Sequence, residues 1–528
     1  MSKIISGDRA AALIMDGDTI GINGFGFGYG FAEEIAQAIE ARFLKETAPK
    51  ELTLLFASGC GDSGKSNFGL DHFAHEGMIK RVIGGHVGLA KKLSQMINED
   101  MVEAYNFPQG VITHLFREIA GGKPGVITHV GLKTFADSCV EGGKMNASAR
   151  EDLVEIIQVG GNDKLFYKSM PVQVALIRGT TADEFGNITI EKEGVALETM
   201  HIAQSAKNSG GIVIAQVERV TKRGTLNPLD VRIPGIMVDY IVIADQDNHR
   251  MNIGTAYDPA FTGEIKVPMN RIEAMPMNIR KIIAKRCAME LGLDTIINLG
   301  IGVPEGIALV ALEEGIDDRL TMTIEAGSVG GVPGAKHNLG GAVNAEAIIG
   351  QPNIFDYYDG GGLDTAFLGL AQADRHGNIN VSKFNGRMVG CGGFVNITQN
   401  TKHVIFCGTF TAGKSNIEIK DKQLNIIEDG QYIKFIHQVE QITFSGDYAN
   451  QTGQLVLYVT ERAVFQLTQE GLELIEIAPG IDLKKHILDR MEFEPIISKD
   501  LKQMDSRIFE DIVLGLKHEN AVRGRGTL

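Results

Sequence analysis

One acidic side chain stands at the end of an apolar segment and directly before a run of glycines. Glu325 lies in RLTMTIEAGSVGG (319–331), and glycines follow it at positions 327, 330, 331 and 334. A carboxylate at the end of a buried strand is costly unless it is paired or hydrogen-bonded. Glu325 is therefore either a hydrogen-bonded structural residue or a reactive group that faces a cleft and is surrounded by backbone amides.

Two other glycine clusters could supply hydrogen-bond donors for such a group. They are Gly300-Ile301-Gly302 and the segment GCGG (390–393). An oxyanion that develops during acyl transfer needs preorganised donors, and a backbone without bulky side chains offers its N–H groups directly. Each cluster can equally be a tight turn, and the residues alone leave both interpretations open.

The segment GCGDSGKS (59–66) fits two nucleotide-binding patterns, G-x-x-x-x-G-K-S and G-x-G-x-x-G, and follows an apolar strand. A phosphate-binding loop requires a helix that starts at the lysine, yet Asn67 and Gly69 would occupy the first turn of that helix. We therefore expect neither ATP nor a dinucleotide as a cofactor.

The elements that position these residues form a diverged internal repeat. DTIGINGFG (18–26) and DTIINLGIG (294–302) are identical at five of nine positions. Each is followed by a helical stretch and a second matched strand, ELTLLFASGCG (51–61) and RLTMTIEAGSVGG. Two more pairs follow in the same order, VALIRGTTADEFGNI with TAFLGLAQADRHGNI and GGIVIAQ with KHVIFCG. In this alignment Glu325 stands opposite Ala57, so only the second half carries the acid.

Apolar segments of strand length alternate with helical segments in both halves, which predicts an α/β fold with mainly parallel sheets. We expect two tandem, structurally similar open α/β domains at 1–265 and 266–528, with an extra segment at about 90–170. The boundary falls within 256–278, which contains three prolines and no clear period. Asn278 is the predicted N-cap of a helix over 279–291. Because ligands bind at the carboxyl ends of parallel strands, we expect the active site in the cleft between the domains.

The composition excludes several classes of protein. A net charge of -15 argues against nucleic acid or an anionic membrane as a partner. No apolar run approaches about 18 residues, and Asp8 and Arg9 interrupt the segment where a signal peptide would be apolar. The five cysteines include no Cys-x-x-Cys pair, and His72 and His75 have no second ligand cluster. We expect a reduced, cytoplasmic protein without a metal ion.

Six segments together resemble the family I coenzyme A transferases, in particular the single-chain acetate/propionate CoA-transferases. They are NLGIGVPEGIA, TIEAGSVGGVP, NFPQGVITHLFREIAGGKPGVIT, RIPGIMVDYIVIAD, GGGLDTAFLGLAQADRHGNI and TERAVFQLTQEGLELIEIAPGIDL. The resemblance covers about residues 10–515. It implies the CoA-transferase (NagB-like) fold, with coenzyme A as a substrate and with neither metal nor ATP as a cofactor.

The resemblance also implies a mechanism. Glu325 matches the family's nucleophile, which moves CoA between short-chain acyl-CoAs and free acids by a ping-pong route through a glutamyl-CoA thioester. The Ile301 amide and one glycine of the 390–393 loop would form the oxyanion hole, and the Pro-Gln-Gly triplet of NFPQG (106–110) would orient the acid. The implied residues are Glu325 for catalysis; Gly300, Ile301, Gly302, Val303, Gly390 and Gly392 for the oxyanion and CoA; and Gln109, Gly110, Gly24 and Phe25 for the acid.

The sequence departs from the family pattern at two places. Many relatives have Glu-Asn-Gly where this chain has Glu325-Ala326-Gly327, and their Gly-Gly-Phe corresponds to Asn23-Gly24-Phe25 without the following proline. These departures put the acyl pocket, not the nucleophile, in question. The alternatives are an acyl-CoA hydrolase, a non-catalytic CoA or metabolite sensor, and an ATP-driven acid–CoA ligase. A homo-oligomer, in particular a tetramer, is also expected.

Overall fold

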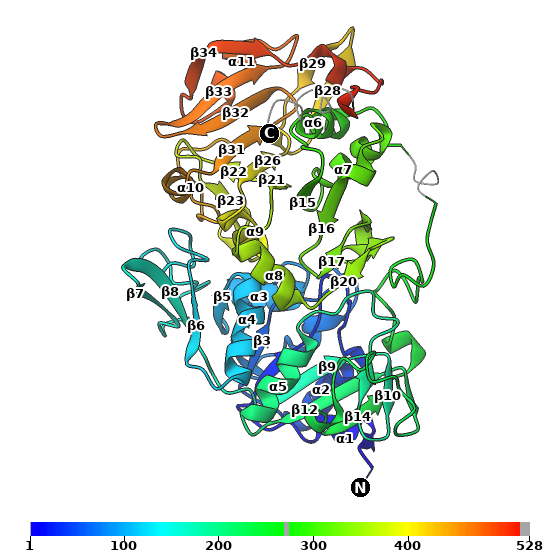
Figure 1. Ribbon diagram of the computed structural model, residues 1–528. Coiled ribbons are helices and arrows are strands. Elements are labelled where there is room, and N and C mark those ends of the chain that lie inside the picture. Colours follow the sequence, from blue (N-terminus) through cyan, green and yellow to red (C-terminus); the bar gives the residue numbers. More distant parts are fainter. Residues whose placement is uncertain (1, 269–273, 518–528) are drawn as a thin grey trace. The chain divides into compact units, whose positions relative to one another are not determined.

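The computed structural model describes residues 2–268 and 274–517, and the chain forms two compact units (Figure 1). Unit 1 consists of Met1–Lys266, Ile324–Asp356 and Ser382–Asn396, and unit 2 of Val267–Thr323, Tyr357–Val381 and Ile397–Leu528. The chain first leaves unit 1 inside the predicted boundary segment 256–278, of which 269–273 lie outside the described residues. Because two segments of the second half belong to unit 1, the units differ from the predicted domains 1–265 and 266–528.

Unit 1 is built on an eight-stranded sheet in which every neighbouring pair is parallel. In sheet order the strands are β1 (Ile4–Ile5), β14 (Tyr240–Ile243), β12 (Ile212–Val217), β9 (Val174–Arg178), β2 (Thr19–Ile22), β3 (Leu52–Phe56), β4 (Ile79–Gly84) and β5 (Glu103–Asn106).

Helices cover both faces of this sheet, as a parallel sheet requires. They are α1 (Gly7–Ala11), α2 (Glu33–Glu46), α3 (Lys91–Asn98), α4 (Gln109–Ala120) and α5 (Thr199–Asn208). Successive residues of β3 enter two separate apolar cores, because side chains of a strand alternate between its faces. Leu55 packs in the core that contains α4 and α5, whereas Leu54 and Phe56 pack in the core that contains α1, α2 and α3.

Smaller elements complete unit 1. The extra segment at 90–170 contains β5, α3, α4 and an antiparallel sheet of β6 (Gly125–Thr128), β8 (Asn162–Lys168) and β7 (Val154–Val159). The others are β10 (Thr181–Asp183), β11 (Ile188–Thr189), β13 (Arg219–Thr221), β17 (Ser328–Val329), β18 (Val332–Pro333), β19 (Ala342–Val343), β20 (Ala347–Ile348), β24 (Lys383–Phe384), β25 (Arg387–Met388), and the short helices η1 (Gly69–Phe73), η2 (Gly235–Met237), η3 (Gln246–Asn248) and η6 (Lys336–Asn338).

Unit 2 contains a second sheet of similar construction. Its strands, in sheet order, are β16 (Leu320–Thr323), β15 (Thr295–Leu299), β21 (Thr365–Gly369), β26 (His403–Cys407), β31 (Leu455–Val459), β32 (Ala463–Thr468), β33 (Gly471–Ile477) and β34 (Ile496–Gln503). The first five strands are parallel, and β32 and β33 extend the sheet as antiparallel neighbours.

The remaining elements lie in unit 2 or carry the chain between the units. Helices α8 (Gln351–Asp359) and α9 (Phe394–Gln399) each contain a point where the chain leaves unit 1. Those of unit 2 are α6 (Ile279–Ala288), α7 (Glu305–Glu313), α10 (Gly446–Thr452), α11 (Leu483–His486), η5 (Asp317–Arg319), η7 (Leu488–Arg490), η8 (Ser506–Phe509), β22 (Gln372–Ala373), β23 (Ile379–Asn380), β27 (Thr411–Ala412), β28 (Asn416–Lys420), β29 (Gln423–Glu428) and β30 (Tyr432–Ile433).

The two sheets confirm the predicted repeat. The order β14-β12-β9-β2-β3 in unit 1 is matched by β31-β26-β21-β15-β16 in unit 2, and the four matched sequence pairs fall on equivalent strands. The predicted α/β fold with mainly parallel sheets is therefore confirmed. The predicted cap is confirmed as well, since the Asn278 side chain accepts a hydrogen bond from the N–H of Lys281 at 3.1 Å.

The repeated Ala-Asp-x-x-Gly-Asn-Ile motif folds into the same turn twice. Asp183 accepts hydrogen bonds from the N–H groups of residues 185, 186 and 187 at 2.9–3.0 Å, and Asp374 accepts them from residues 376 and 378 at 3.0 and 3.1 Å. The following asparagines also match: Asn187 and Asn378 each accept a bond from a distant glycine N–H, at 2.8 and 3.0 Å.

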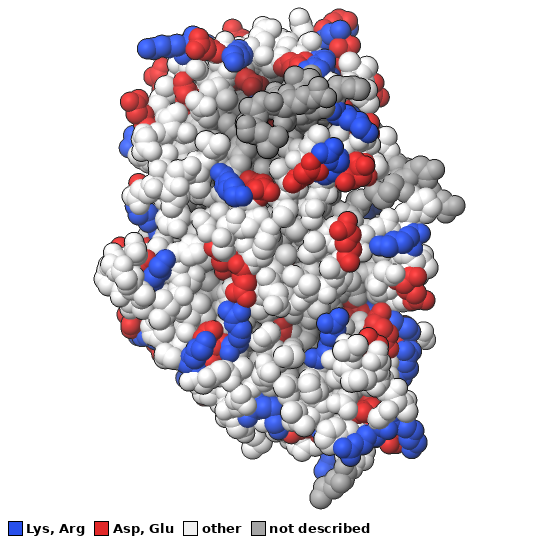
Figure 2. All heavy atoms as spheres, in the orientation of Figure 1, with Lys and Arg blue, Asp and Glu red and all other residues white. Residues whose placement is uncertain are grey.

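The acidic excess does not form a single patch on the face shown in Figure 2. Basic and acidic side chains are intermixed there, although the chain as a whole has a net charge of -15. Such a surface favours solubility over binding to a polyanion.

Candidate active site

Several predicted site residues follow the carboxyl ends of neighbouring strands in unit 1. Asn23 and Gly24 come directly after β2, and Pro108 precedes Gln109, where α4 begins shortly after β5. Gly85 follows β4 in the same way. Because these strands are parallel, their carboxyl ends lie at one edge of the sheet, which is where α/β proteins bind ligands.

Glu325 belongs to a tight turn in unit 1. The N–H of Gly327 donates to the carbonyl of Ile324 at 2.9 Å, and the N–H of Ile324 donates to the carbonyl of Ser328 at 2.9 Å. Gly327 has φ +111°, and a Cβ atom there would overlap the carbonyl oxygen of Ile349. Only glycine fits this position, so the glycine after the acid fixes the shape of the turn.

The environment of Glu325 suits a reactive carboxylate. Its side chain is half-buried and has no ion pair or side-chain hydrogen bond to another residue among 2–268 and 274–517. Desolvation by burial raises the pKa of Glu325 to about 7, against a smaller lowering by its own backbone. A carboxylate without a cationic partner or hydrogen-bond donors keeps its lone pairs available for attack on an acyl group.

The 390–393 loop is anchored to the strand ends of the same unit. The N–H of Gly392 donates to the carbonyl of Gly85 at 2.8 Å, that of Cys391 to Asn106 Oδ1 at 3.0 Å, and that of Gly390 to the carbonyl of Ser382 at 3.2 Å. Gly393 has no acceptor for its N–H among the residues that the structure describes. The amides of the predicted residues Gly390 and Gly392 are therefore already engaged, and Gly393 carries the free donor of the loop.

Gln109 presents an unused donor beside this loop. Its backbone N–H donates to the carbonyl of Gly392 at 3.0 Å, so the side chain starts next to the glycine loop. The side chain is buried, yet Nε2 has no acceptor within the described part of the chain. Gly110 donates its N–H to Asn396 Oδ1 at 3.0 Å, and a Cβ there would overlap the Asn396 side chain. The structure thus places Gln109 as a donor and Gly110 as a point of close packing.

Gly24 and Phe25 lie in a closely packed segment that follows β2. Gly24 has φ +150°, and a Cβ there would lie 2.6 Å from Cys60 Sγ, so a larger residue does not fit. Phe25 is buried in an apolar cluster that also contains Leu197 and Ala326. Ala326 follows Glu325 directly, so this apolar cluster includes a residue of the Glu325 turn.

The remaining predicted residues, Gly300 to Val303, lie in unit 2 between β15 and α7. The N–H of Gly300 donates to the carbonyl of Phe367 at 2.8 Å, and that of Gly302 donates to Glu305 Oε1 at 2.9 Å. Within the described ranges, the N–H groups of Ile301 and Val303 have no acceptor. Ile301 is 62% exposed, which is unusual for a large apolar residue.

Comparison with known proteins gives consistent matches over nearly the whole chain. The Coenzyme A transferase family model matches residues 4–244. A caffeate CoA-transferase from Acetobacterium woodii is 48% identical over 97% of this chain and 98% of that protein. The acetate CoA-transferase YdiF of Escherichia coli strain K12 is 40% identical over 97% of this chain and 96% of that protein.

The chain belongs to the coenzyme A transferase family. A crystal structure of the acyl-CoA transferase YdiF from E. coli O157:H7, in a thioester complex with CoA, matches with a TM-score of 0.92 and 39% identity, over 97% of both chains. The predicted family and the CoA-transferase fold are thereby confirmed.

In this CoA-transferase the segment GCGDSGKS does not form an open phosphate-binding loop. Asp62 Oδ1 accepts hydrogen bonds from the N–H groups of Gly64 and Lys65, both at 2.9 Å, and Oδ2 accepts one from Ser66 Oγ at 2.5 Å. The chain's own carboxylate thus occupies the amides that would hold a phosphate in a nucleotide-binding loop. No helix starts at Lys65, and the next element in the described chain is η1.

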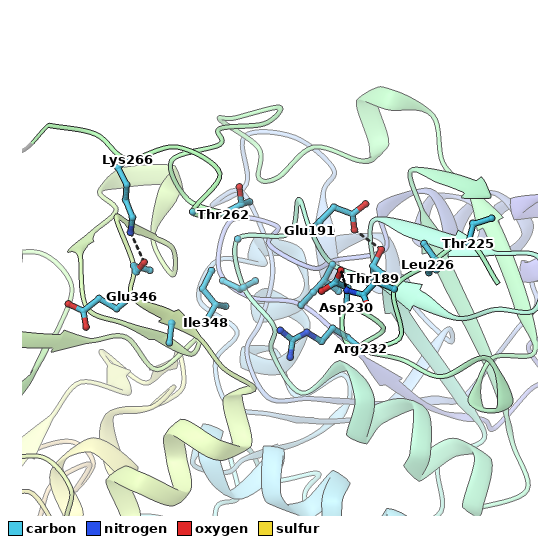
Figure 3. Close-up of a pocket in the computed structure, with 17 residues that line it drawn as sticks. Thr189, Glu191, Thr225, Leu226, Asp230, Arg232, Thr262, Lys266, Glu346 and Ile348 are labelled. Atoms are coloured by element: carbon cyan, nitrogen blue, oxygen red, sulfur yellow. Dashed lines mark hydrogen bonds between the residues drawn. The ribbon is translucent and has the colours of Figure 1, made fainter. Parts of the chain in front are cut away.

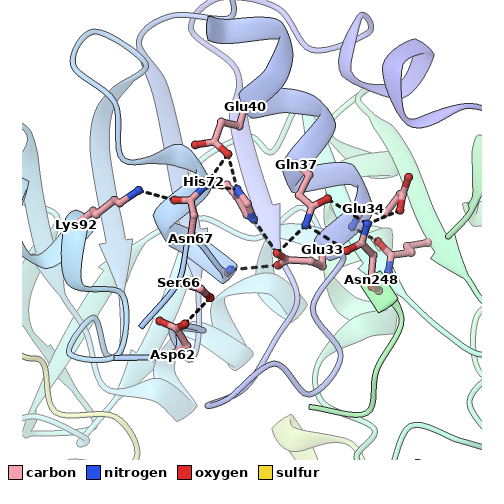
Figure 4. Close-up of polar contacts among 12 residues, drawn as sticks. Glu33, Glu34, Gln37, Glu40, Asp62, Ser66, Asn67, His72, Lys92 and Asn248 are labelled. Atoms are coloured by element: carbon pink, nitrogen blue, oxygen red, sulfur yellow. Dashed lines mark hydrogen bonds and ion pairs between the residues drawn. The ribbon is translucent and has the colours of Figure 1, made fainter. Parts of the chain in front are cut away.

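His72 takes part in a buried ionic network (Figure 4), and His75 joins it through Glu40. His72 lies between Glu33 and Glu40, with N···O distances of 2.7 and 2.6 Å, and His75 contacts Glu40 at 2.7 Å. Burial alone would lower the pKa of His72, but the hydrogen bonds and charges of the two glutamates raise it. The two histidines therefore tie α2 to the segment after the glycine-rich loop.

Unit 1 contains a cavity of about 710 Å³ (Figure 3). Its walls come from 189–195, 225–232, 262–266 and 345–348. The last segment includes β20, which pairs with β17 three residues after Glu325. Its volume lies in the range of small-molecule sites.

The sequence did not single out Glu198 and Gln351, two buried residues of unit 1 whose side chains lack partners among the described residues. Glu198 follows the apolar segment GVAL and precedes α5, and Gln351 begins α8. From sequence alone, either residue could be a solvated helix cap. Their burial, which only the structure shows, distinguishes them from such caps. No helix in the described chain is long and apolar enough to span a membrane.

Proposed function

We propose that this chain transfers coenzyme A between short-chain acyl-CoAs and free carboxylic acids, with Glu325 as the covalent nucleophile. The observation that carries this proposal is the state of Glu325: a half-buried carboxylate with a raised pKa, no cationic partner among the described residues, and a tight glycine turn. The solved YdiF thioester complex, at 39% identity, supports the same covalent route.

The reaction balances without an added cofactor. A Glu325 oxygen attacks the acyl-CoA carbonyl and the C–S bond breaks. CoA leaves as a thiolate, and the acyl group remains on Glu325 as a mixed anhydride. The thiolate then attacks the glutamyl carbonyl, which releases the free acid and leaves a glutamyl-CoA thioester. The acceptor carboxylate repeats these steps in reverse. Covalent catalysis of this kind replaces one difficult exchange by several easier ones.

Each step develops an oxyanion, and two free backbone donors are suited to it. They are the N–H groups of Ile301 and Gly393, which have no acceptor among 2–268 and 274–517. Loss of one preorganised donor typically costs about 3 kcal/mol of transition-state stabilisation. Gln109 Nε2, a third unused donor, would bind the carboxylate of the acid. A location of these groups around one cleft between the domains stays a prediction.

A larger, aromatic acid is the second candidate substrate. It is favoured by the 48% identity to an enzyme named for caffeate, compared with 40% for one named for acetate. Initial rates with acetate, propionate, butyrate and caffeate as acceptors of CoA separate the two candidates.

A trapping experiment tests the function itself. The protein is incubated with propionyl-CoA alone, treated with borohydride or hydroxylamine, and mapped by mass spectrometry. Modification of Glu325, with acetyl-CoA formed only after acetate is added and without ATP, supports transfer. Release of propionate without an acceptor would indicate a hydrolase, and no modification would indicate a sensor. A cytoplasmic homo-oligomer stays a prediction, which sedimentation and cell fractionation can check.

A further inference from the structure

Three buried polar side chains of unit 1 have unused hydrogen-bonding atoms. Asn23, Glu198 and Gln351 are at most 1% exposed. Asn23 Oδ1, both carboxyl oxygens of Glu198, and both polar atoms of the Gln351 side chain have no partner within the described residues. A buried polar group without a partner loses its hydrogen bonds to water, so folded proteins rarely leave several of them unpaired together.

These side chains come from three separate segments that meet at Leu197. The carbonyl of Leu197 accepts the N–H of Gln351 at 2.9 Å, and Glu198 is the next residue in the chain. A Cβ at Gly30 would lie 2.8 Å from Leu197 Cδ1 and 3.1 Å from Asn23 Nδ2, so Leu197 and Asn23 flank the same point. The end of β2 and the N-termini of α5 and α8 therefore meet at Leu197, and each of these segments carries one of the three polar side chains.

The cluster is next to the proposed site of acyl transfer. Leu197 packs in one apolar cluster with Phe25 and Ala326, and Ala326 directly follows the proposed nucleophile. Asn23 directly precedes Gly24, at one of the two places where the sequence departs from the family pattern. A buried polar side chain therefore stands directly before Gly24 and Phe25.

The three groups together offer donors and acceptors without a fixed charge. Asn23 Nδ2 already donates to the carbonyl of Gly30 at 3.0 Å, so its Oδ1 is an acceptor. Gln351 offers both an acceptor and donors. Burial raises the pKa of Glu198 to about 8, so this carboxyl is mostly protonated at neutral pH and can donate as well as accept.

A hydroxyl group, which donates one hydrogen bond and accepts others, matches this set. We propose that Asn23, Glu198 and Gln351 recognise a hydroxyl on the acyl part of the acid, so that the enzyme selects hydroxylated acids; this rests on the proposed function. A site built to hydrogen-bond a substrate hydroxyl rejects the analogue without it by up to about 10⁴–10⁵-fold, because its own polar groups then stay unpaired.

The test compares acids that differ by one hydroxyl at two chain lengths. The pairs are 3-hydroxypropionate with propionate and 4-hydroxycinnamate with cinnamate, each as acceptor with acetyl-CoA as donor. We expect kcat/KM to favour the hydroxylated acid by at least tenfold in at least one pair. Ratios below twofold in both pairs would overturn the inference and leave buried water as the partner of the three side chains.

Variants separate recognition from a structural effect. Glu198→Leu and Gln351→Leu should bring the ratio below twofold, whereas Glu198→Gln, which keeps a neutral donor and acceptor, should retain it. Ser169→Ala is the matched control, because Ser169 Oγ is also buried without a partner but follows β8; its ratio should equal that of the wild type. Glu198→Leu should also raise the melting temperature, since it removes an unpaired buried group.

Two other outcomes contradict the inference. An unchanged ratio in both leucine variants would do so, as would a change confined to the KM of acyl-CoA, which would assign the cluster to CoA. Trapping of the Glu325 thioester in the same preparations distinguishes this failure from failure of the proposed function. If no thioester forms in the wild type, calorimetric binding of each acid pair to the wild type and variants still measures the hydroxyl preference without turnover.

Discussion

The two copies of the repeat end their second strand in different ways. In unit 1, β3 is followed by Ala57, which is fully buried and whose carbonyl oxygen would overlap a Cβ atom at Gly85. The equivalent position after β16 is Glu325, a half-buried carboxylate without a cationic partner in the described chain. The strands have the same order in both copies, so the proposed chemistry depends on the few residues that follow them.

Replacement of Glu325 by alanine would make the second copy resemble the first. We expect CoA exchange between propionyl-CoA and labelled acetate to fall by about 10⁴-fold or more, because loss of a covalent nucleophile removes the whole route. Ala57→Gly, the matched change in the first copy, should stay within a few-fold of the wild type. Exchange at the original rate in Glu325→Ala would exclude this residue as the nucleophile.

The raised pKa of Glu325 predicts a pH dependence. Burial holds this pKa at about 7, so below pH 7 the reactive carboxylate is progressively protonated and thioester formation should fall about tenfold per pH unit. Single-turnover rates from pH 5 to pH 8 measure this fall, and a flat profile would contradict it. The pKa of Glu325 is 4.5 in the unfolded chain and about 7 in the folded protein, so the charged carboxylate destabilises the folded state increasingly as pH rises from 4.5 to 7. Glu325→Gln lacks this charge, so its stability relative to the wild type should increase over the same range.

Gln109 tests what the first copy of the repeat contributes, because it is the proposed hydrogen-bond donor to the acid, whereas the second copy carries Glu325. Gln109→Leu removes the unpaired Nε2 and should raise the KM of the acid by about 10- to 100-fold, as expected for a hydrogen bond to a charged group. The KM of acyl-CoA should change much less. Gln95→Leu, at an exposed position of α3, is the control. Equal effects on both substrates would argue against a specific contact with the acid.

The repeat, the parallel sheets and the position of Glu325 were predictable because they depend on local patterns. Strand-length apolar segments and matched phrases are visible in the sequence, and so is the Asn278 cap. The assignment of Ile324–Asp356 to unit 1 was not, because it depends on packing of Ala326 with residues about 65 to 300 positions away in sequence.

Hydrogen-bond use within the glycine loops was not predictable either. Sequence makes Gly390, Gly392 and Gly393 equivalent, and only the fold shows that the first two amides bond to Ser382 and Gly85. Glu198 and Gln351 were missed for a related reason. An acid or amide at a helix N-terminus is ordinarily a solvated cap, and only burial shows that these two lack partners.

The two Asp turns give a smaller, matched effect on stability. Asp183→Asn and Asp374→Asn each weaken a set of hydrogen bonds to backbone N–H groups and should each cost about 1–2 kcal/mol at pH 7. Burial tends to raise the pKa of Asp183, but its hydrogen bonds lower it overall. Its contribution is therefore present above its ordinary pKa and is lost as pH falls through the lowered one. Urea unfolding at several pH values measures both variants, and an unaffected Asp374→Asn would show that the two turns are not equivalent.

Replacement of Lys65 has the smallest expected effect. It tests whether the segment GCGDSGKS (59–66) binds phosphate groups. In a phosphate-binding loop the lysine contacts the phosphates, so its loss would abolish activity. Here Lys65 is exposed, and its N–H is one of two that bind the Asp62 carboxylate. We therefore expect Lys65→Ala to leave the KM of acyl-CoA and kcat within twofold of the wild type. A tenfold rise in the KM of acyl-CoA, matched by weaker inhibition by pyrophosphate, would instead assign the loop to the phosphates of CoA. The first copy of the repeat would then take part in substrate binding through the segment that aligns with the nucleophile turn of the second.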